Sequence, residues 1–270
     1  MSGGAFVTAD GCRLAFFVEG EGRPVLWQHG LGAGEEQPAS VFPHRPGLQR
    51  ITLMCRGLGE SDLGDPAFLS IATLTADALA LLDHVEVERG AVGGISLGVG
   101  IALRLAVLHS VRVTRLVLAR PAWVDQPGPQ TQMAYVAAGD FLARHGEGEG
   151  LRLFQASDAF ARLKAASEDN AASLIGFFSR PRPETTVALL ARRPKDGPGV
   201  SRRASADIAV PTLVIGHDAD LVHPLAYAED LAGLIAGARL ARITAKALDR
   251  ACYTREFTEA LAFFLDEGRS

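Results

Sequence analysis

The chain has 270 residues, 48% of them hydrophobic, and a formal net charge of −4 at pH 7. A chain of this length can bury a core of its own, and its weak negative charge provides no footprint for nucleic acid or for an anionic membrane. Its longest apolar runs, such as residues 101–108, are far shorter than the roughly 20 residues that a membrane-spanning helix needs.

Strand-like runs alternate with helical patterns through most of the sequence. The run PVLWQ at 24–28 is almost continuously apolar, which is typical of a strand covered on both faces. Apolar residues at 74, 78, 81, 82 and 85 recur at helical spacing, and Thr73 could cap that helix. The alternation predicts an α/β fold with a mostly parallel central sheet and helices on both of its faces. The predicted strands are 14–18, 24–28, 50–55, 90–94, 113–119, 212–216 and 239–244.

Residues 124–209 break the alternation. They contain helical patches punctuated by Pro and Gly and no convincing strand, and about 85 residues are too many for a simple connection between two strands. We therefore predict a helical lid, residues 124–209, inserted into a core made of residues 1–123 and 210–270. A separately folding second domain is the less favoured alternative, because the chain returns to core strands afterwards.

The segment AVGGISLGVG, residues 91–100, carries the pattern G-x-S-x-G between a predicted strand and a predicted helix, which is the context that gives the pattern its meaning. The sharp turn would force Ser96 into a strained backbone conformation and present its hydroxyl above the sheet. Gly94 and Gly98 would let the neighbouring backbone pass without a clash. The pattern predicts a nucleophilic serine, and a chance glycine-rich turn is the alternative.

A second glycine-rich segment, LWQHGLGAG at 26–34, follows a predicted core strand. Its backbone N–H groups can point toward a developing oxyanion, and acyl transfer needs two such donors. The predicted donors are the N–H groups of Leu31, directly after His29 and Gly30, and of Leu97, directly after Ser96. We expect His29 and Gly30 to lie beside the substrate.

With these two segments in this order, the chain resembles the α/β-hydrolase superfamily, and the resemblance covers nearly its whole length. The segment RGLGESD at 56–62 is similar to a loop of that family, R-G-x-G-x-S. The segment PTLVIGHDADLVHP at 211–224 resembles the strand and loop that carry the acid of the family's catalytic triad. The resemblance implies that Asp220 is this acid, with Asp218 in reserve, and that Val222 and His223 line the pocket beside the serine.

The usual catalytic base of the family is missing. Alignment of the C-terminal pattern on Phe257 and Phe264 places Ala247 where the family has its triad histidine, and no histidine follows His223. A serine hydroxyl without a base is a poor nucleophile at neutral pH, so either the base has moved or the chemistry has changed.

His223 is the predicted replacement for this base. It stands three residues after Asp220, and an imidazole there could titrate near pH 7 and reach Ser96 directly or through a water. The alternative is a surface or helix-capping histidine. Weaker candidates for the base are His29, His217 and Lys246.

The predicted lid gives two hints about a ligand. Residues 180–203 hold seven basic residues against Glu184 and Asp196, which could steer a carboxylate or phosphate toward the cleft or could form a solvated basic face. Phenylalanines at roughly helical intervals could roof the pocket, with Phe177 against the substrate, or could form the seam between lid and core, which is slightly favoured. They are Phe154, Phe160, Phe177 and Phe178.

These features predict a serine-dependent hydrolase of an ester, thioester or lactone with an atypical triad, acting on a small molecule that is anionic if the basic segment faces the cleft. Two alternatives stay open: a non-hydrolytic epimerase, lyase or cyclase whose oxyanion hole stabilises an enolate, and a catalytically inactive ligand-binding protein. The N-terminus lacks the pattern of a secretory signal, and we expect free thiols in a reducing cytoplasm, with neither metal nor cofactor. The three scattered cysteines are Cys12, Cys55 and Cys252.

Overall fold

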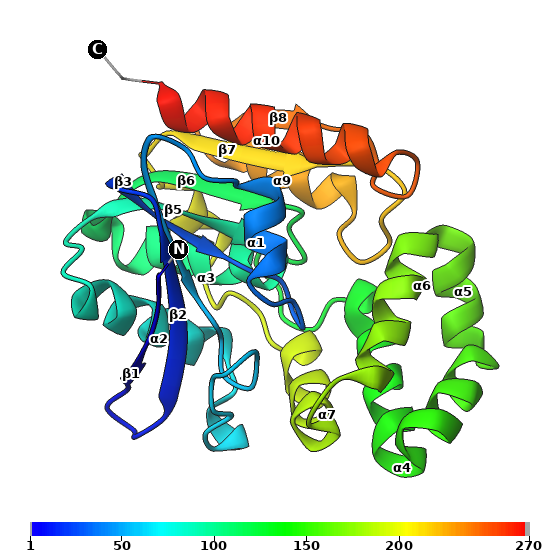
Figure 1. The fold of residues 1–270 in the computed structure, drawn as a ribbon. Coiled ribbons are helices and arrows are strands. Elements are labelled where there is room, and N and C mark those ends of the chain that lie inside the picture. The colour runs from blue at the N-terminus through cyan, green and yellow to red at the C-terminus, as the bar shows by residue number, and fades with distance from the viewer. Residues whose placement is uncertain (1, 268–270) are drawn as a thin grey trace.

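One mixed sheet forms the centre of the molecule, which a computed structural model describes for residues 2–267 (Figure 1). In this described range its eight strands lie in the order β1-β2-β4-β3-β5-β6-β7-β8. β2 pairs antiparallel with β1 and β4, and the remaining pairs are parallel, so the predicted mostly parallel sheet is confirmed. The strands are β1 (Ser2–Val7), β2 (Arg13–Glu19), β3 (Gly22–Gln28), β4 (Gly47–Leu53), β5 (Gly90–Ile95), β6 (Val113–Ala119), β7 (Thr212–Gly216) and β8 (Arg239–Arg242).

The edge strand β1 is not predicted by the sequence pattern, because its two glycines have little intrinsic preference for a strand. Its register is set by pairing with β2, where Gly4 lies opposite Phe16. A Cβ atom on Gly4 would stand 2.6 Å from the Phe16 ring, so glycine is what lets the aromatic side chain lie across the edge strand. Here a tertiary contact overrides local propensity.

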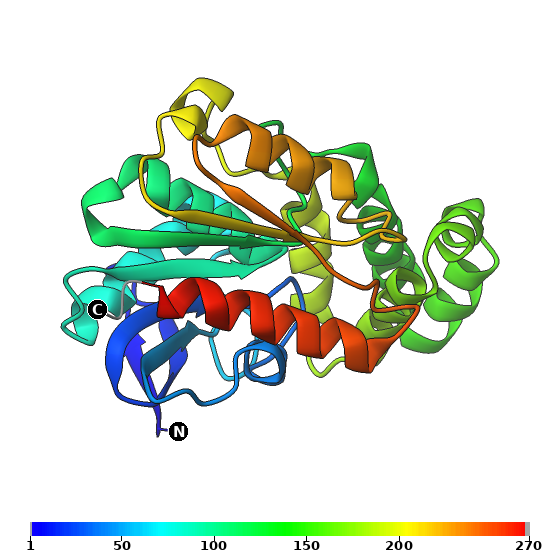
Figure 2. The same cartoon turned by 90° about the horizontal axis from the view of Figure 1, so that it is seen from above.

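Helices cover both faces of the sheet, as predicted (Figures 1 and 2). On one face, apolar side chains of α2, α3 and α9 pack against Leu26, Ile51 and Val214. On the other face, α1 and α10 pack against the sheet, with Phe257 edge-on to Trp27. Full burial of one such large side chain contributes roughly 1.5–3 kcal/mol. The helices are α1 (Glu36–Val41), α2 (Ile71–His84), α3 (Leu97–Leu108), α9 (Leu225–Leu234) and α10 (Arg250–Asp266).

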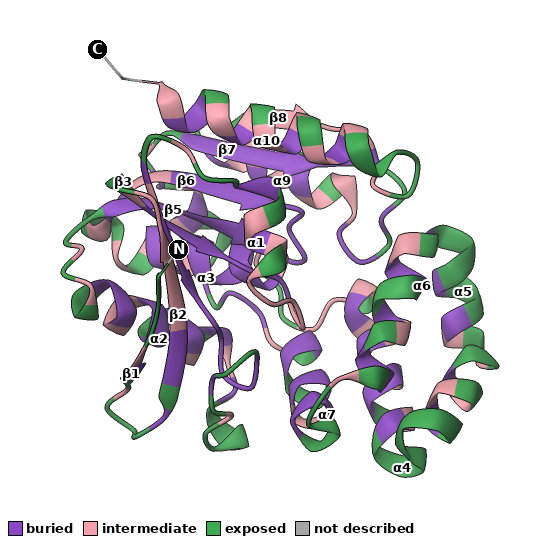
Figure 3. Cartoon of the chain, in the orientation of Figure 1, coloured by how far each residue is buried: buried purple, intermediate pink, exposed green. Residues whose placement is uncertain are grey.

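Between β6 and β7 the described chain forms an inserted helical region, which lies beyond the carboxyl ends of the strands in Figure 1. Its helices enclose an apolar cluster of their own, and their outward faces are exposed (Figure 3). The predicted helical insertion is thereby confirmed. Its elements are η3 (Gln130–Gln132), α4 (Met133–Gln155), α5 (Asp158–Ala166), α6 (Glu168–Ile175), η4 (Gly176–Ser179), α7 (Pro183–Arg192), η5 (Arg193–Lys195) and α8 (Arg202–Ala206).

The parallel strands bring several polar residues to one edge of the sheet. His29 follows β3, Ser96 follows β5, Arg120 follows β6 and the segment 217–224 follows β7. The carboxyl ends of parallel strands meet at one edge, where α/β proteins bind their ligands. The inserted helices stand over this same edge. None of the helices in the described range is long and apolar enough to cross a membrane.

Candidate active site

Ser96 stands at a sharp turn between β5, which ends at Ile95, and α3, which begins at Leu97. Its φ of +56° lies in the left-handed region, which costs energy for a residue with a side chain. A Cβ atom on Gly98 would lie 2.6 Å from the carbonyl oxygen of Gln28, so the turn packs tightly against β3. The strained turn that G-x-S-x-G predicts is present, and it places the serine at the N-terminus of a helix.

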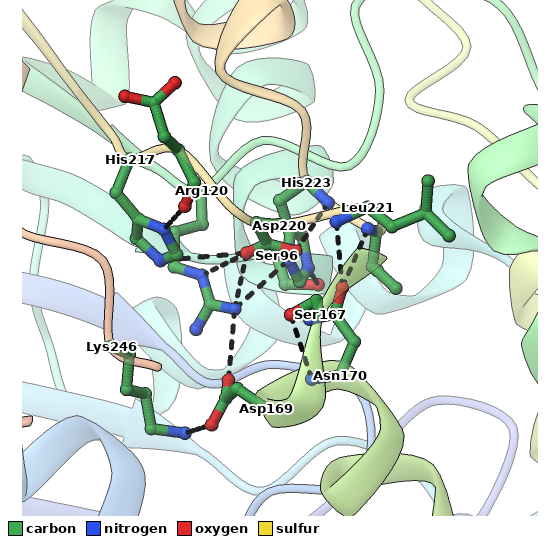
Figure 4. Close-up of polar contacts among 12 residues, drawn as sticks. Ser96, Arg120, Ser167, Asp169, Asn170, His217, Asp220, Leu221, His223 and Lys246 are labelled. Carbon is green, nitrogen blue, oxygen red and sulfur yellow. Dashed lines mark hydrogen bonds and ion pairs between the residues drawn. The ribbon is translucent and has the colours of Figure 1, made fainter. Parts of the chain in front are cut away.

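His223 contacts this serine directly. Its Nε2 lies 2.8 Å from Oγ of Ser96, although the two residues belong to different strand-to-helix connections (Figure 4). On the other side of the ring, Nδ1 lies 3.0 and 3.1 Å from the two carboxylate oxygens of Asp220. The backbone N–H of His223 also donates to Oδ1 of Asp220 at 3.0 Å. Serine, imidazole and carboxylate thus form one continuous chain of hydrogen bonds.

Arg120 joins this chain from the end of β6. Its Nε and Nη2 donate to Oδ2 of Asp220 at 3.0 and 2.6 Å, and Nη2 lies 3.4 Å from Nδ1 of His223. The guanidinium also lies over the ring of Tyr253, 6.0 Å from its centroid. Arg120 was not among the site residues predicted from the sequence. The available signal was a charged residue directly after a buried strand, at the edge of the sheet where ligands bind.

Charges and burial together set the protonation states. Burial alone would raise the pKa of Asp220, but the charges of His223 and Arg120, with hydrogen bonds from both, hold it far below its ordinary value. Burial lowers the pKa of His223, Arg120 lowers it further, and Asp220 opposes both. At neutral pH the carboxylate is therefore charged and the imidazole neutral. A neutral imidazole that donates from Nδ1 to Asp220 has a free lone pair at Nε2 for the serine proton.

His217 and Lys246 lie near this chain of hydrogen bonds without contacting the serine. Nε2 of His217 lies 3.7 Å from Oδ2 of Asp220, and its ring is edge-on to Tyr253. Burial lowers the pKa of His217. Nζ of Lys246 lies 2.6 Å from a carboxylate oxygen of Asp169, in helix α6. Neither weaker candidate for the base is hydrogen-bonded to Ser96 in the described residues.

The glycine-rich loop after β3 abuts the serine. A Cβ atom on Gly30 would lie 3.5 Å from Cβ of Ser96, and the Gly30 N–H donates to Oε1 of Gln37 at 2.7 Å. Both ring nitrogens of His29 contact backbone: Nε2 accepts from the N–H of Cys55 at 3.1 Å, so Nδ1 donates to the carbonyl of Gly30 at 2.8 Å. Burial lowers the pKa of His29, which keeps the ring neutral. His29 thus fixes the loop through its two hydrogen bonds.

The two predicted oxyanion donors belong to this loop and to the helix that follows the serine. Leu97 is the first residue of α3, so its N–H has no acceptor within the helix. Leu31 lies on the loop after His29 and Gly30, and its side chain packs against both the sheet core and the cluster of the inserted helices. Neither N–H donates to another residue in the described range.

The phenylalanines of the inserted region lie inside its own apolar cluster. Phe177, which is 2% exposed, packs edge-on against Tyr135, and Val222 from the loop after β7 belongs to the same cluster. Leu31 and Val222 join this cluster to the core, whereas Phe154 packs against Phe160 and Phe178 within the inserted helices. Leu31, Val222 and Phe177 therefore belong to one apolar cluster, which the inserted helices share with two loops of the core.

The basic segment 180–203 does not form a single face. Arg193 is buried, and Arg202 pairs with Asp230 at the surface. Arg180 and Arg182 instead reach the carbonyl groups of Gly32 and Gly59, across a cavity of about 450 Å³ beside the glycine-rich loop. In the described range no group of His, Cys, Asp and Glu has the arrangement of a metal site.

Comparisons with known proteins show which proteins this chain is similar to. No family model matches the chain. A 2-hydroxymuconate semialdehyde hydrolase of Pseudomonas putida is 31% identical over 249 residues, which are 88% of this chain and 84% of that protein. The AB hydrolase superfamily protein YisY of Bacillus subtilis is 26% identical over 81% of this chain and 82% of its own length.

Among solved structures, Est816, an enzyme that degrades N-acyl homoserine lactones, matches with a TM-score of 0.72 and 26% identity, over 96% of this chain and 99% of that one. Sequence similarity extends over 81–88% of this chain in the two relatives, and similarity of fold over 96%. The chain belongs to the α/β-hydrolase superfamily, and it is a hydrolase.

Proposed function

We propose that the chain hydrolyses an ester or lactone through a covalent acyl-serine, with Ser96 as nucleophile, His223 as general base and Asp220 as the acid that orients it. The observation that carries this proposal is the 2.8 Å contact between Nε2 of His223 and Oγ of Ser96. In this arrangement the base comes from the loop after β7 and not from the loop after β8, where Ala247 stands.

The reaction begins when Oγ of Ser96 attacks the carbonyl carbon of the substrate and Nε2 of His223 takes the serine proton. The carboxylate of Asp220, held by Arg120, accepts a hydrogen bond from Nδ1 and stabilises the imidazolium that forms. The imidazolium then protonates the leaving alkoxide. In the second half a water attacks the acyl-serine and His223 takes its proton. The imidazolium then returns this proton to Oγ of Ser96 as the carboxylic acid product leaves.

The tetrahedral intermediate carries a negative charge on the former carbonyl oxygen. The N–H groups of Leu31 and Leu97 are the proposed donors to this oxygen. Loss of one such donor costs about 10²–10³-fold in rate in related chemistry. The two hydrogen bonds of His29 would keep the Leu31 loop in place, and Gly30 allows the loop to approach the serine closely.

The surroundings of the serine favour a substrate with an apolar acyl part. Leu31, which is partly buried, supplies apolar surface on the loop beside the serine, while Arg180 and Arg182, which line the cavity beside this loop, suit a carboxylate on the substrate. Two relatives act, by their names, on a 2-hydroxymuconate semialdehyde and on N-acyl homoserine lactones. N-acyl homoserine lactones are proposed test substrates for this chain, because they contain the lactone bond that this mechanism cleaves.

The experiment combines active-site labelling with turnover. The native chain should react with a fluorophosphonate probe and hydrolyse a p-nitrophenyl ester, and Ser96→Ala should lose both. His223→Gln should lose about 10⁴-fold or more in kcat because the base is gone. The matched control His217→Gln removes a neighbouring imidazole that does not contact the serine, and should lose far less.

Two results would overturn this proposal: full turnover in Ser96→Ala, or equal effects of His223→Gln and His217→Gln. Incorporation of solvent deuterium into a carbonyl substrate without cleavage would instead indicate enolate chemistry at the same oxyanion donors.

A further inference from the structure

The loop that carries His223 is irregular and strained. It runs from 217 to 224 between β7 and α9, and Ala219, just before Asp220, has a φ of +56°. An irregular loop keeps one conformation only if surrounding contacts hold it. His223 and Asp220 bond each other within the loop, so those bonds cannot set the position of the loop relative to Ser96.

Arg120 holds the side chain of Asp220, and the contacts to the backbone of Leu221 and Val222 come from the inserted helices (Figure 4). Oδ1 of Asn170, in the first turn of α6, accepts the backbone N–H groups of Leu221 and Val222 at 2.9 and 3.1 Å. Nε2 of Gln132, in η3, donates to the carbonyl of Val222 at 3.0 Å. Both backbone polar groups of the residue that precedes His223 are therefore bonded to the inserted region.

Asn170 is itself firmly placed. It is 4% exposed, and its own N–H donates to Oγ of Ser167, the residue that caps α6. With two N–H donors facing it, the side chain must present its oxygen and not its NH₂ to the loop. Removal of this oxygen would leave two buried N–H groups without an acceptor, which costs far more than an average hydrogen bond contributes.

The same turn of α6 also places a carboxylate near Arg120 and Lys246, two basic residues of which Arg120 is paired with Asp220. The carboxylate of Asp169 lies 2.6 Å from Nζ of Lys246 and 3.8 Å from Nη2 of Arg120. Arg120 in turn is bonded to Asp220. The side chain of Asn170 thus bonds the backbone of the loop that carries His223. In the same helix, Asp169 lies beside Arg120, which is the positive charge paired with Asp220.

We propose that Asn170 is a positioning residue for the base: its amide oxygen fixes the loop so that Nε2 of His223 stays within hydrogen-bond distance of Ser96. This inference rests on the proposed function. It makes the inserted helical region part of the machinery that aligns the base, in addition to any role in covering the substrate. A displacement of about 1 Å at reacting groups can cost about 10²-fold in rate.

The test compares Asn170→Ala with Asn170→Asp and with Glu168→Gln. Asn170→Ala should lower kcat for a p-nitrophenyl ester about 10- to 100-fold, with KM nearly unchanged and a matching loss in the rate of fluorophosphonate labelling. Asn170→Asp should recover most of kcat, since a carboxylate can accept the same two N–H groups. Glu168→Gln alters an exposed residue of the same helical turn and should behave as the native chain.

A double-mutant cycle separates positioning from a general structural role. If Asn170 acts only through His223, the double variant Asn170→Ala/His223→Ala should be no slower than His223→Ala alone. Additive losses would overturn the inference, as would a kcat within threefold of native in a folded Asn170→Ala. If Asn170→Ala does not fold, Gln132→Met, which removes the hydrogen bond to the carbonyl of Val222, is tested in its place. It is combined with His223→Ala in the same double-mutant cycle and judged by the same criteria. Full activity of His223→Ala would refute the proposed base itself, which is a distinguishable result.

Discussion

Asp220 and His223 stand three residues apart on one loop and contact each other through side chain and backbone: Nδ1 of His223 lies 3.1 and 3.0 Å from Oδ1 and Oδ2 of Asp220, and the His223 N–H donates to Oδ1 at 3.0 Å. The proposed acid and base therefore form one local unit, while Ser96 belongs to another connection of the sheet. Tertiary structure has to supply only the placement of this unit against the serine. The α/β scaffold can accept such a unit because the ends of β5, β6 and β7 converge at one edge.

Asp220→Asn should lower kcat by about 10⁴-fold, the order found when a triad aspartate becomes an amide. An amide can donate to Nδ1, which favours the imidazole tautomer that has no lone pair at Nε2. It also leaves the guanidinium of Arg120 beside His223 without its carboxylate partner. Turnover of a p-nitrophenyl ester measures the effect. Asp218→Asn, an exposed change two residues away, is the control, and similar losses in both variants would contradict the assignment of the acid.

The pH at which kcat/KM falls to half on the acid side should lie below 6.5, because the ordinary pKa of histidine is about 6.5 and that of His223 is lowered. The base works only when deprotonated, so activity is lost as the pH falls through the pKa of His223. Burial and Arg120 lower that pKa. Arg120→Gln should therefore move this half-maximal pH upward, and an unchanged value would show that the guanidinium has no such effect. The other groups that face the imidazole region are Asp220, Asp169, His217, Tyr135 and Tyr253.

Gly98→Ala should disturb the turn at Ser96. The new Cβ would stand 2.6 Å from the backbone oxygen of Gln28, which cannot move away cheaply. We expect a loss of about 1–3 kcal/mol in the free energy of unfolding, measured by urea denaturation, together with a loss of ester turnover. Gly100→Ala is the matched control, because its Cβ would meet only the flexible end of Ile71, at 2.9 Å. Equal destabilisation by the two changes would contradict this account of the turn.

Arg193→Met should stabilise the fold. Arg193 is 1% exposed, and its three guanidinium nitrogens have no hydrogen-bond partner in the described residues. Burial lowers its pKa to about 10, with partial opposition from Cys55 and Asp196. Removal of an unpaired buried charge is expected to add about 1–3 kcal/mol to the free energy of unfolding.

The melting temperature checks this prediction, and Arg192→Met, an exposed change at the next position, should leave it almost unaltered. A lower melting temperature in Arg193→Met would show that the electrostatic attraction of neighbouring acidic groups outweighs the cost of burying the charge.

Local signals in the sequence were sufficient for strands β2 to β8, the helical insertion and the turn at Ser96. One side of each strand or helix is buried, so apolar residues recur with the period of that element. Gly94 and Gly98, at fixed positions around Ser96, mark a tight turn that leaves no room for a side chain there. The same kind of signal failed at β1, and it placed the cap of α2 at Thr73, whereas the structure has Ser70, whose Oγ accepts the N–H of Thr73 at 3.1 Å. Boundaries are decided by contacts as much as by propensity.

Only the tertiary structure decided what surrounds His223. Arg120 is 100 residues from Asp220 in the chain, and Asn170 is 51 residues from Leu221. No period or motif links residues at such separations, because their meeting depends on how the sheet converges and how the inserted helices lie over it. The sequence alone determined that a serine stands on a strained turn beside a glycine-rich loop. The fold decided which imidazole reaches that serine and which side chains hold it there.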